Sequence, residues 1–221
     1  MRGQFITFEG GEGSGKSTHA RLLADKLKAL GLEVVVTREP GGSPGAEIIR
    51  HILLSGLAKP LGADTEAILF AAARDDHVRT VILPAITAGK WVVCDRFIDS
   101  TRVYQGAVGN VDPRLIRGLE RLTVGAAVPD LTFILDVPAT VGLARAKRRR
   151  GSGPADRYEA EAVQFHEQLR GAYRALAEQE PLRCVIVDGR APRDVVTARI
   201  WEIVQRRLNP EPARLAETVA P

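Results

Sequence analysis

Gly10-Gly11-Glu12-Gly13-Ser14-Gly15-Lys16-Ser17 is the stretch of sequence that decides the fold. Its spacing, a glycine followed after four residues by Gly-Lys-Ser, is typical of a loop that wraps around phosphate groups. The glycines let consecutive backbone N–H groups approach an anion closely at the start of a helix. Lys16 would bring a positive charge to the β- and γ-phosphates, and Ser17 would offer a hydroxyl to Mg²⁺. The stretch therefore predicts a site for a nucleoside triphosphate.

The flanking residues provide the structural context that such a loop needs. Before it, Phe5-Ile6-Thr7-Phe8 is a short apolar run of the kind found in strands. After it, leucines at positions 22, 23, 27 and 30 form an apolar helical face, and Gly31 stands where that helix is expected to end. A glycine-rich turn that only caps a helix is the alternative, which this order of strand, loop and helix disfavours.

Along the rest of the chain, strand-like and helical segments alternate. The strand-like runs are almost continuously apolar, as expected for strands covered on both faces of a parallel sheet. Alternation of this kind indicates a three-layer, doubly wound α/β fold around a parallel five-stranded sheet. The expected strands are Gln4–Glu9, Leu32–Thr37, Trp91–Asp95, Leu131–Val137 and Leu182–Asp188. The expected helices lie near 16–30, 45–55, 64–88, 112–125, 138–149, 158–178 and 192–208.

Length and composition favour a single globular domain. The 221 residues are 45% apolar and 26% charged, which suits one α/β domain or a domain with a small subdomain. We expect one domain over residues 1–209, with a frayed tail at 210–221. No apolar stretch reaches the roughly 18–20 residues of a membrane span, and the N-terminus does not read as a signal peptide. The protein is therefore expected to be cytoplasmic, with Cys94 and Cys184 as free buried thiols. The net charge of +4 does not distinguish an enzyme of phosphorylated anions from a nucleic-acid binder.

Val92-Val93-Cys94-Asp95 is an apolar strand that ends in a carboxylate. In enzymes with a phosphate-binding loop, such an aspartate holds Mg²⁺ directly or through water, so Ser17 and Asp95 are the candidate metal ligands. Asp136 and Asp188 also end strands, but only Asp95 is followed by an arginine. Arg96 would point into the crevice at the carboxyl end of the sheet, where its planar guanidinium suits a phosphate. A structural salt bridge is the alternative for Arg96.

Taken in order, these and several further motifs closely resemble those of the bacterial thymidylate kinase family, from about residue 3 to residue 208. The resemblance implies the P-loop nucleoside monophosphate kinase fold, Mg²⁺ as cofactor and a homodimer. It implies transfer of the γ-phosphoryl group of ATP to thymidine monophosphate (dTMP), giving thymidine diphosphate (dTDP) and ADP. The further motifs are Thr37-Arg38-Glu39-Pro40-Gly41-Gly42, Phe70 with Arg74, Asp95-Arg96-Phe97, Ser100-Thr101, Tyr104-Gln105-Gly106, Pro129-Asp130-Leu131 and Leu135-Asp136-Val137.

The resemblance also assigns residues to the base and sugar of dTMP. Phe70 would stack on the thymine, and Arg74, one helical turn later, would donate to its O4. Ser100-Thr101 would reach N3, Tyr104 would pack beneath C2′ and exclude a ribose hydroxyl, and Gln105 would lie beside the nucleotide. Taken alone, Phe70 reads as a core aromatic and Arg74 as a solvated surface residue. Ser100-Thr101 alone reads as a helix N-cap, an interpretation compatible with the functional one.

Other residues are assigned to the phosphates and the 3′-hydroxyl. Glu12 would accept a hydrogen bond from the substrate 3′-OH, since a carboxylate inside a phosphate-binding loop otherwise only repels ATP. Arg96 would grip the acceptor phosphate, with Arg38 assisting. Thr18 and Arg145 would join Gly10–Ser17 in binding ATP.

A basic run over Arg145–Arg150, with Arg157 beyond a Gly-Pro break, lies where the lid of a nucleotide kinase, here about residues 145–158, closes over ATP. One group of the family carries an arginine at the position of Gly13, whereas this chain resembles the group that supplies that charge from the lid. Arg145 and Arg149 are four residues apart and expected to point together. Arg149 best matches the catalytic arginine, with Arg148 and Arg150 as open alternatives. Seen alone, such a run is usually a solvated face or a nucleic-acid patch.

Other functions and the expected partners complete the sequence-based expectations. Another P-loop nucleotide or nucleoside kinase is the nearest alternative, but it would lack the Arg-Glu-Pro-Gly-Gly segment or the Phe70 and Arg74 pair. A GTPase would need Asn-Lys-X-Asp, and neither Asn110 nor Asn209 is followed by lysine. A nucleic-acid ATPase would bind DNA with a steep salt dependence. The expected partners are therefore ATP and dTMP, with no nucleic acid and no membrane. The expected dimer contact uses helix 64–88, through Ile68, Leu69, Ala72, Val78 and Ile82.

Overall fold

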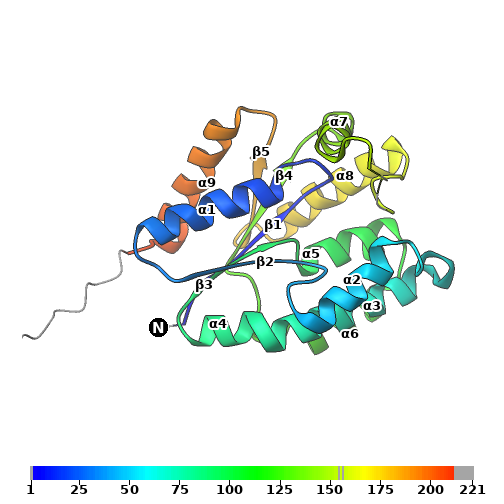
Figure 1. Cartoon of the computed structure of the whole chain (residues 1–221), viewed down its shortest axis with the longest axis horizontal. Coiled ribbons are helices and arrows are strands. Elements are labelled where there is room, and N and C mark those ends of the chain that lie inside the picture. Colours follow the sequence, from blue (N-terminus) through cyan, green and yellow to red (C-terminus); the bar gives the residue numbers. More distant parts are fainter. Residues whose placement is uncertain (1, 154, 156, 212–221) are drawn as a thin grey trace, which may run out of the picture.

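The computed structural model describes residues 2–153, 155 and 157–211, and five parallel strands form its central sheet (Figure 1). The strand order is β2-β3-β1-β4-β5, so β1, which precedes the phosphate-binding loop, lies in the middle. The bounds agree with the expected strands to within two residues. They are β1 (Phe5–Glu9), β2 (Val34–Arg38), β3 (Trp91–Asp95), β4 (Leu131–Asp136) and β5 (Cys184–Asp188).

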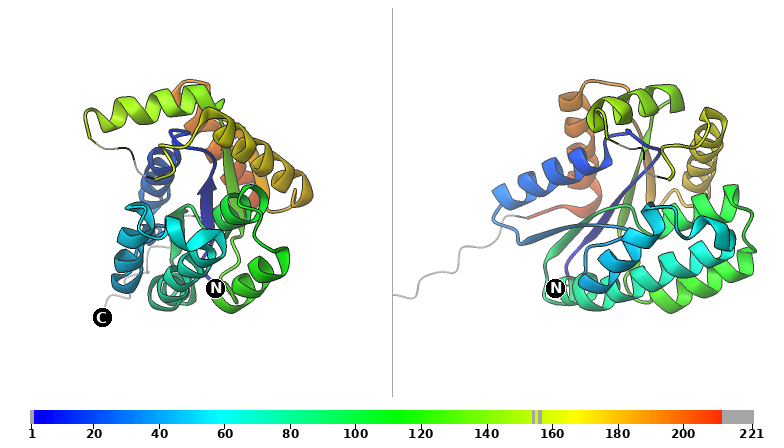
Figure 2. Two further views of the ribbon diagram at one scale, coloured as in Figure 1. Left: turned by 90° about the vertical axis from the view of Figure 1, so that its right-hand side faces the viewer. Right: turned by 45° about the vertical axis from the view of Figure 1, so that its right-hand side comes forward.

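Helices cover both faces of the sheet, which confirms the three-layer α/β expectation. α1 (Lys16–Ala29) and α9 (Arg193–Leu208) lie side by side on one face, where Leu23 and Leu27 pack with Ile200 and Val204 (Figure 1). The remaining long helices lie toward the other face (Figure 2). They and the shorter segments are α2 (Pro44–Leu54), η1 (Lys59–Leu61), α3 (Gly62–His77), η2 (Val78–Ile82), α4 (Leu83–Thr87), α5 (Ile98–Thr101), η3 (Arg102–Val108), α6 (Pro113–Thr123), α7 (Ala139–Arg150) and α8 (Val163–Gln179).

The strand register brings three chain segments to one edge of the sheet. Phe8 of β1 and Arg38 of β2 both align with Asp95, the last residue of β3. The phosphate-binding loop, the segment after β2 and the segment after β3 therefore begin at the same edge. β1 is buried along its whole length, and the hydroxyls of Thr7 and Thr132 inside the sheet satisfy one another at 2.7 Å.

The helical segment over Ile98–Val108 was not expected from the sequence. It comprises α5 and the π-helical η3, and it is rich in β-branched residues, which have modest helix propensity. Because Phe97 is the N-cap of α5, Ser100 and Thr101 lie inside the helix, so their interpretation as an N-cap is wrong. The expected helix 64–88 is present as α3, the π-helical η2 and α4 in direct succession.

The other differences concern the ends of segments. The last expected helix before β5 begins at Val163 rather than near residue 158, and α7 ends at Arg150, where the Gly-Ser-Gly break was expected to end it. Cys94 and Cys184 are free and buried, as expected. Positions 154 and 156 of the expected lid, and most of the expected tail at 210–221, lie outside the described residues.

Candidate active site

A cavity of about 210 Å³ lies where these segments meet, and every residue that the sequence assigned to dTMP lines it. The catalytic candidates Lys16, Asp95 and Arg149 line it as well, together with Ser17. The sequence did not single out Arg50, Leu54 or Tyr158 as site residues, although they also line it. The lining residues assigned to dTMP are Glu12, Arg38, Phe70, Arg74, Arg96, Ser100, Thr101, Tyr104 and Gln105.

The phosphate-binding loop connects β1 to the first turn of α1. Lys16 is the first residue of α1, and its Nζ donates to the carbonyls of Gly10 at 3.0 Å and Gly11 at 2.8 Å. Burial, and then repulsion by Arg96, lower the pKa of Lys16 to about 8. Gly13 has φ +64°, and a Cβ there would lie 2.0 Å from the carbonyl oxygen of Gly142 in α7. An arginine therefore does not fit at position 13 unless α7 moves.

Ser17 and Asp95 form the part of the site suited to a metal ion. The Ser17 hydroxyl donates to Oδ2 of Asp95, whereas Oδ1 is buried and has no hydrogen-bond partner among the described residues. These are the hard oxygen donors that Mg²⁺ prefers, and one or two protein ligands beside substrate phosphates are usual for this ion. Within residues 2–153, 155 and 157–211, no group of three or more His, Cys, Asp or Glu side chains could hold a metal without a substrate.

Arg96 lines the cavity and is held in place by several contacts. Its φ of +69° lies in the left-handed region, which is uncommon outside glycine and is a form of strain often found at functional sites. One nitrogen of its guanidinium pairs with Glu12, and Nη1 donates to Ser100 Oγ at 3.2 Å. The guanidinium also lies over the ring of Tyr104, 5.2 Å from its centroid. Burial opposes ionisation of Glu12, but Arg96 and then Lys16 more than offset this and lower the pKa of Glu12 to about 2.

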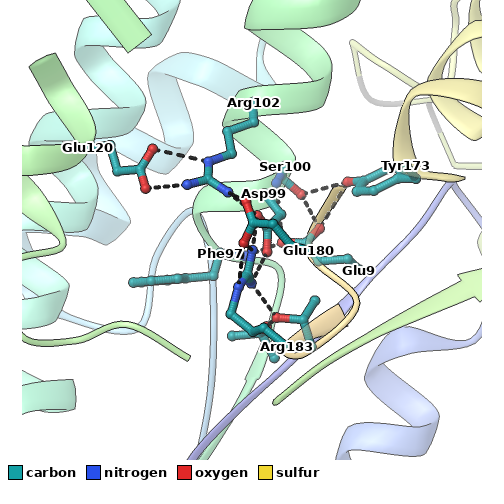
Figure 3. Close-up of polar contacts among 11 residues, drawn as sticks. Glu9, Phe97, Asp99, Ser100, Arg102, Glu120, Tyr173, Glu180 and Arg183 are labelled. Carbon is teal, nitrogen blue, oxygen red and sulfur yellow. Dashed lines mark hydrogen bonds and ion pairs between the residues drawn. The ribbon is translucent and has the colours of Figure 1, made fainter. Parts of the chain in front are cut away.

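Glu9, the last residue of β1, holds side chains that contact Arg96, and the sequence did not identify it. Its partners Phe97, Ser100 and Tyr173 are labelled in Figure 3. Its Oε2 accepts hydrogen bonds from the hydroxyls of Ser100 at 2.7 Å and Tyr173 at 2.9 Å. Its Oε1 accepts from the backbone N–H of Phe97 at 2.8 Å. Burial, and then the charge of Asp99, raise the pKa of Glu9 to about 7. Since Tyr173 and Ser100 both contact Arg96, Glu9 helps to hold that guanidinium.

A second buried carboxylate ties the short helix α5 to its surroundings (Figure 3). Asp99 is fully buried and accepts two hydrogen bonds from Arg183, at 2.6 and 2.9 Å. Arg102 also pairs with Asp99, at 3.2 Å, and reaches Glu180 at 2.6 Å and Glu120 of α6. The network holds Ser100 and Thr101 in place by fixing the helix on which they lie.

The end of the cavity assigned to the base is built around Arg74. Arg74 is only 2% exposed, so its interpretation as a solvated residue is wrong. Its Nε donates to Glu39 at 2.9 Å, and Nη2 donates to Thr101 Oγ1 at 3.0 Å. Phe70 is half-buried on the same helix. Tyr104 is buried and lines the same cavity, and its hydroxyl donates to Glu12 at 3.3 Å.

The arginines of the lid have separate partners. Arg149 lines the cavity, is 65% exposed and pairs with Glu159 at 3.2 Å. Arg150 pairs with the same carboxylate, and Arg148 is exposed. Arg145 instead donates to the carbonyl of Gly189 at 2.9 Å, so Arg145 and Arg149 do not share a partner although they are four residues apart. Of the three neighbouring candidates in the described part of the lid, Arg149 is the one that lines the cavity.

Comparison with known proteins adds an independent observation. The family model described as thymidylate kinase matches residues 8–200. The chain belongs to the thymidylate kinase family. A thymidylate kinase of Nitrobacter winogradskyi is 63% identical over 207 residues, covering 94% of this chain and 90% of the relative. One of Bradyrhizobium diazoefficiens is 58% identical, covering 96% and 93%.

A solved structure agrees with this family membership. The thymidylate kinase of Ehrlichia chaffeensis superposes with a TM-score of 0.74 at 33% identity, covering 93% of this chain and 99% of the other. The expected family and the P-loop nucleoside monophosphate kinase fold are thereby confirmed. Among the described residues, no helix has both the length and the apolar character needed to cross a membrane.

Proposed function

We infer that the chain transfers the γ-phosphoryl group of ATP to dTMP, giving dTDP and ADP. Family membership supports this activity, and one structural observation supports it most strongly. Lys16 of the phosphate-binding loop, Arg96 and the Phe70 and Arg74 pair all line a single cavity, and Arg96 contacts both the loop, at Gly10, and Ser100 of α5. A donor phosphate held at one end and a base at the other would place the acceptor phosphate at Arg96.

Catalysis would rest on positioning and on neutralisation of negative charge. The acceptor phosphate is already anionic, so no strong general base is needed, and the charge on the equatorial oxygens must be balanced. Lys16 and Arg96 provide fixed cations within the cavity. Arg149 would add a third, because its own side chain is 65% exposed and Glu159 would keep its pair with Arg150 if Arg149 moved away. The remaining loop residues, Thr18 and Arg145 are proposed to bind ATP.

The other lining residues would bind the nucleoside. Glu12, which stays ionised because of Arg96 and Lys16, would accept the 3′-OH. Phe70 would stack on thymine and Arg74 would donate to O4. Tyr104 would occupy the space beneath C2′. The remaining assignments are Ser100 and Thr101 near N3, Gln105 beside the nucleotide and Arg38 near the acceptor phosphate; Arg38 also pairs with Glu47 at 2.8 Å.

Mg²⁺ is the proposed cofactor. Ser17 and Asp95 would hold it, since they offer a hydroxyl and a buried carboxylate oxygen without a partner among the described residues. When bound, Mg²⁺ would neutralise charge on the β- and γ-phosphates.

We also propose a homodimer and a cytoplasmic location. Val78 and Ile82, which the sequence assigned to the dimer contact, are 3% and 0% exposed and belong to the core, so these two assignments are wrong. Ile68 is 48% exposed and Ala72 is exposed on the same helix, α3, with Leu69 partly buried. These residues remain the proposed contact between two copies. Sedimentation at micromolar concentration tests it, and a monomer would contradict it.

The experiment for the activity is a coupled ADP-release assay with a panel of nucleoside monophosphates. We expect rapid turnover with dTMP, dependence on Mg²⁺ and loss of activity in Lys16→Ala. Faster turnover with another monophosphate would favour the alternative, a different P-loop nucleotide kinase. Absence of turnover with every monophosphate would contradict the proposal.

A further inference from the structure

Four side chains form a continuous hydrogen-bonded chain that begins at Arg74 and Glu39, which line the cavity, and leads away from it to His77 and Thr37. The Thr37 hydroxyl lies 2.7 Å from Nε2 of His77, and Nδ1 of His77 lies 3.0 Å from Oε1 of Glu39. The other oxygen of Glu39, Oε2, accepts from Nε of Arg74 at 2.9 Å. We call Thr37, His77 and Glu39 the Arg74 support. A carboxylate paired with an arginine can only accept, so Nδ1 of His77 is the donor to Glu39.

Burial makes each of these contacts hard to replace with water. The side chain of His77 is 0% exposed, that of Glu39 5% and that of Arg74 2%. His77 and Arg74 are three residues apart on α3 and therefore face the same way, and Glu39 bridges them from the segment after β2. Each oxygen of Glu39 thus has one partner on α3, which fixes the plane of the carboxylate.

A hydroxyl, a histidine and a carboxylate in this order could also form a catalytic triad, with Thr37 as nucleophile, His77 as base and Glu39 as the group that orients His77. The backbone of Gly42 excludes that role. Gly42 has φ +87°, and a Cβ there would lie 2.4 Å from Thr37 Oγ1 and 2.5 Å from His77 Nε2. The backbone of Gly42 therefore covers the Thr37 and His77 contact and leaves no space for a substrate carbonyl. This close approach also gives a physical reason for a glycine at the end of the Arg-Glu-Pro-Gly-Gly segment.

We propose that His77 is a positioning residue that sets selectivity for thymine, by holding Glu39 so that Arg74 keeps the orientation needed to read the base. The inference rests on the proposed function, in which Arg74 donates to O4 of thymine. Glu39 and Thr101 fix Nε and Nη2 of Arg74. Without His77, Oε1 of Glu39 loses its partner and the carboxylate can rotate, so Arg74 is no longer held in one orientation. Cytosine carries an amino group where thymine has O4, so a fixed arginine rejects it.

The test compares three substitutions of His77. His77→Asn keeps an amide nitrogen at the position of Nδ1 and can still donate to Glu39. His77→Gln places its amide at the position of Nε2, and His77→Ala removes both contacts. The dissociation constant of dTMP is measured by calorimetry without ATP, and kcat and KM are measured for dTMP, for dCMP and for ATP.

We expect His77→Ala and His77→Gln to raise the Kd and KM for dTMP about tenfold or more, the size of a lost hydrogen bond to a charged group. The preference for dTMP over dCMP should narrow by a similar factor, while kcat and the KM for ATP stay within about twofold. His77→Asn should stay within about threefold of the wild type in all these quantities. If all three folded variants bind dTMP as tightly as the wild type, the proposal is overturned. It is also overturned if His77→Asn binds dTMP no more tightly than His77→Gln.

Two further comparisons separate positioning from stability. Ile82→Val shortens a buried side chain in the next helical segment without touching Glu39, so it should lower Tm and leave the Kd for dTMP unchanged. Thr37→Val and Thr37→Ser serve if a His77 variant does not fold, because Thr37 is half-buried on the edge strand β2. Val should weaken dTMP binding and Ser should not, and equal affinity would overturn the proposal. The Kd for dTMP is measured without turnover, so it tests the positioning role of His77 separately from the proposed activity. Failure of the proposed activity would instead appear as a wild-type enzyme that does not phosphorylate dTMP.

Discussion

Replacement of Arg149 by alanine is expected to impair catalysis without impairing the fold. The side chain is 65% exposed and, among the described residues, pairs with Glu159 at 3.2 Å. Glu159 is only 6% exposed, but its carboxylate also pairs with Arg150, so removal of Arg149 does not leave it unpaired and the thermal midpoint should hardly change. The same side chain lines the cavity, and Gly13 has no room for an arginine because α7 packs against it.

The size of the catalytic effect follows from that arrangement. If Arg149 is the cation that stabilises the phosphoryl group in flight, its removal should lower kcat by about 10²-fold or more, which corresponds to roughly 2.7 kcal/mol of activation free energy. The KM for dTMP should change little, because the contact is made mainly in the transition state. Arg149→Lys should remain impaired, since an ammonium does not reproduce the planar fork.

Arg148 provides a matched control for this substitution. It is the neighbouring arginine on the same helix and is exposed, but it does not line the cavity. Arg148→Ala should therefore keep kcat within about twofold of the wild type in the ADP-release assay. If Arg149→Ala behaves like Arg148→Ala, the lid does not supply the missing charge and this part of the mechanism is wrong.

Three further predictions concern Lys16 of the phosphate-binding loop, the buried carboxyl group of Glu9, and the selection of deoxyribose by Tyr104. Lys16→Ala should stay folded and lose about 10²–10³ in turnover, and near wild-type turnover would refute the assignment of the loop. Because Glu9 has a folded-state pKa of about 7 against 4.5, its contribution to stability is complete below about pH 4.5 and lost as the pH rises through 7. Relative to Glu9→Gln, the wild type should lose roughly 3 kcal/mol of unfolding free energy between pH 4.5 and 8 in urea titrations, and parallel pH curves would contradict this. If the ring of Tyr104 excludes the ribose 2′-hydroxyl, Tyr104→Phe should still reject the ribonucleotide and Tyr104→Ala should accept it. A wild-type enzyme that phosphorylates the ribonucleotide as well as dTMP would contradict this role of Tyr104.

The sequence predicted those parts of the site whose geometry is set by neighbours along the chain. The spacing of Gly10–Ser17 after a strand places Lys16 at a helix start, and a strand that ends at Asp95 places Arg96 at the same sheet edge. The assignment of Phe70 and Arg74 to the base came from the family resemblance, not from the sequence pattern. The assignment of Tyr104 to the sugar came from the same resemblance.

The remaining parts depend on contacts between residues far apart in the sequence. Asp99 and Arg183 are separated by 84 positions, and nothing local marks either as buried. Glu9 is the last residue of the expected strand Gln4–Glu9, and nothing in that local pattern indicates that it accepts hydrogen bonds from Phe97, Ser100 and Tyr173. The helical form of Ile98–Val108 also depends on tertiary contacts that overcome modest propensity.

The most direct measurement of the central claim is ³¹P NMR of the wild-type protein with ATP, Mg²⁺ and dTMP. Transfer of the γ-phosphoryl group predicts that the resonances of dTDP and ADP grow in equal amounts while those of ATP and dTMP fall. Growth of inorganic phosphate and ADP at the same rate with or without dTMP, and no dTDP, would contradict the proposed activity.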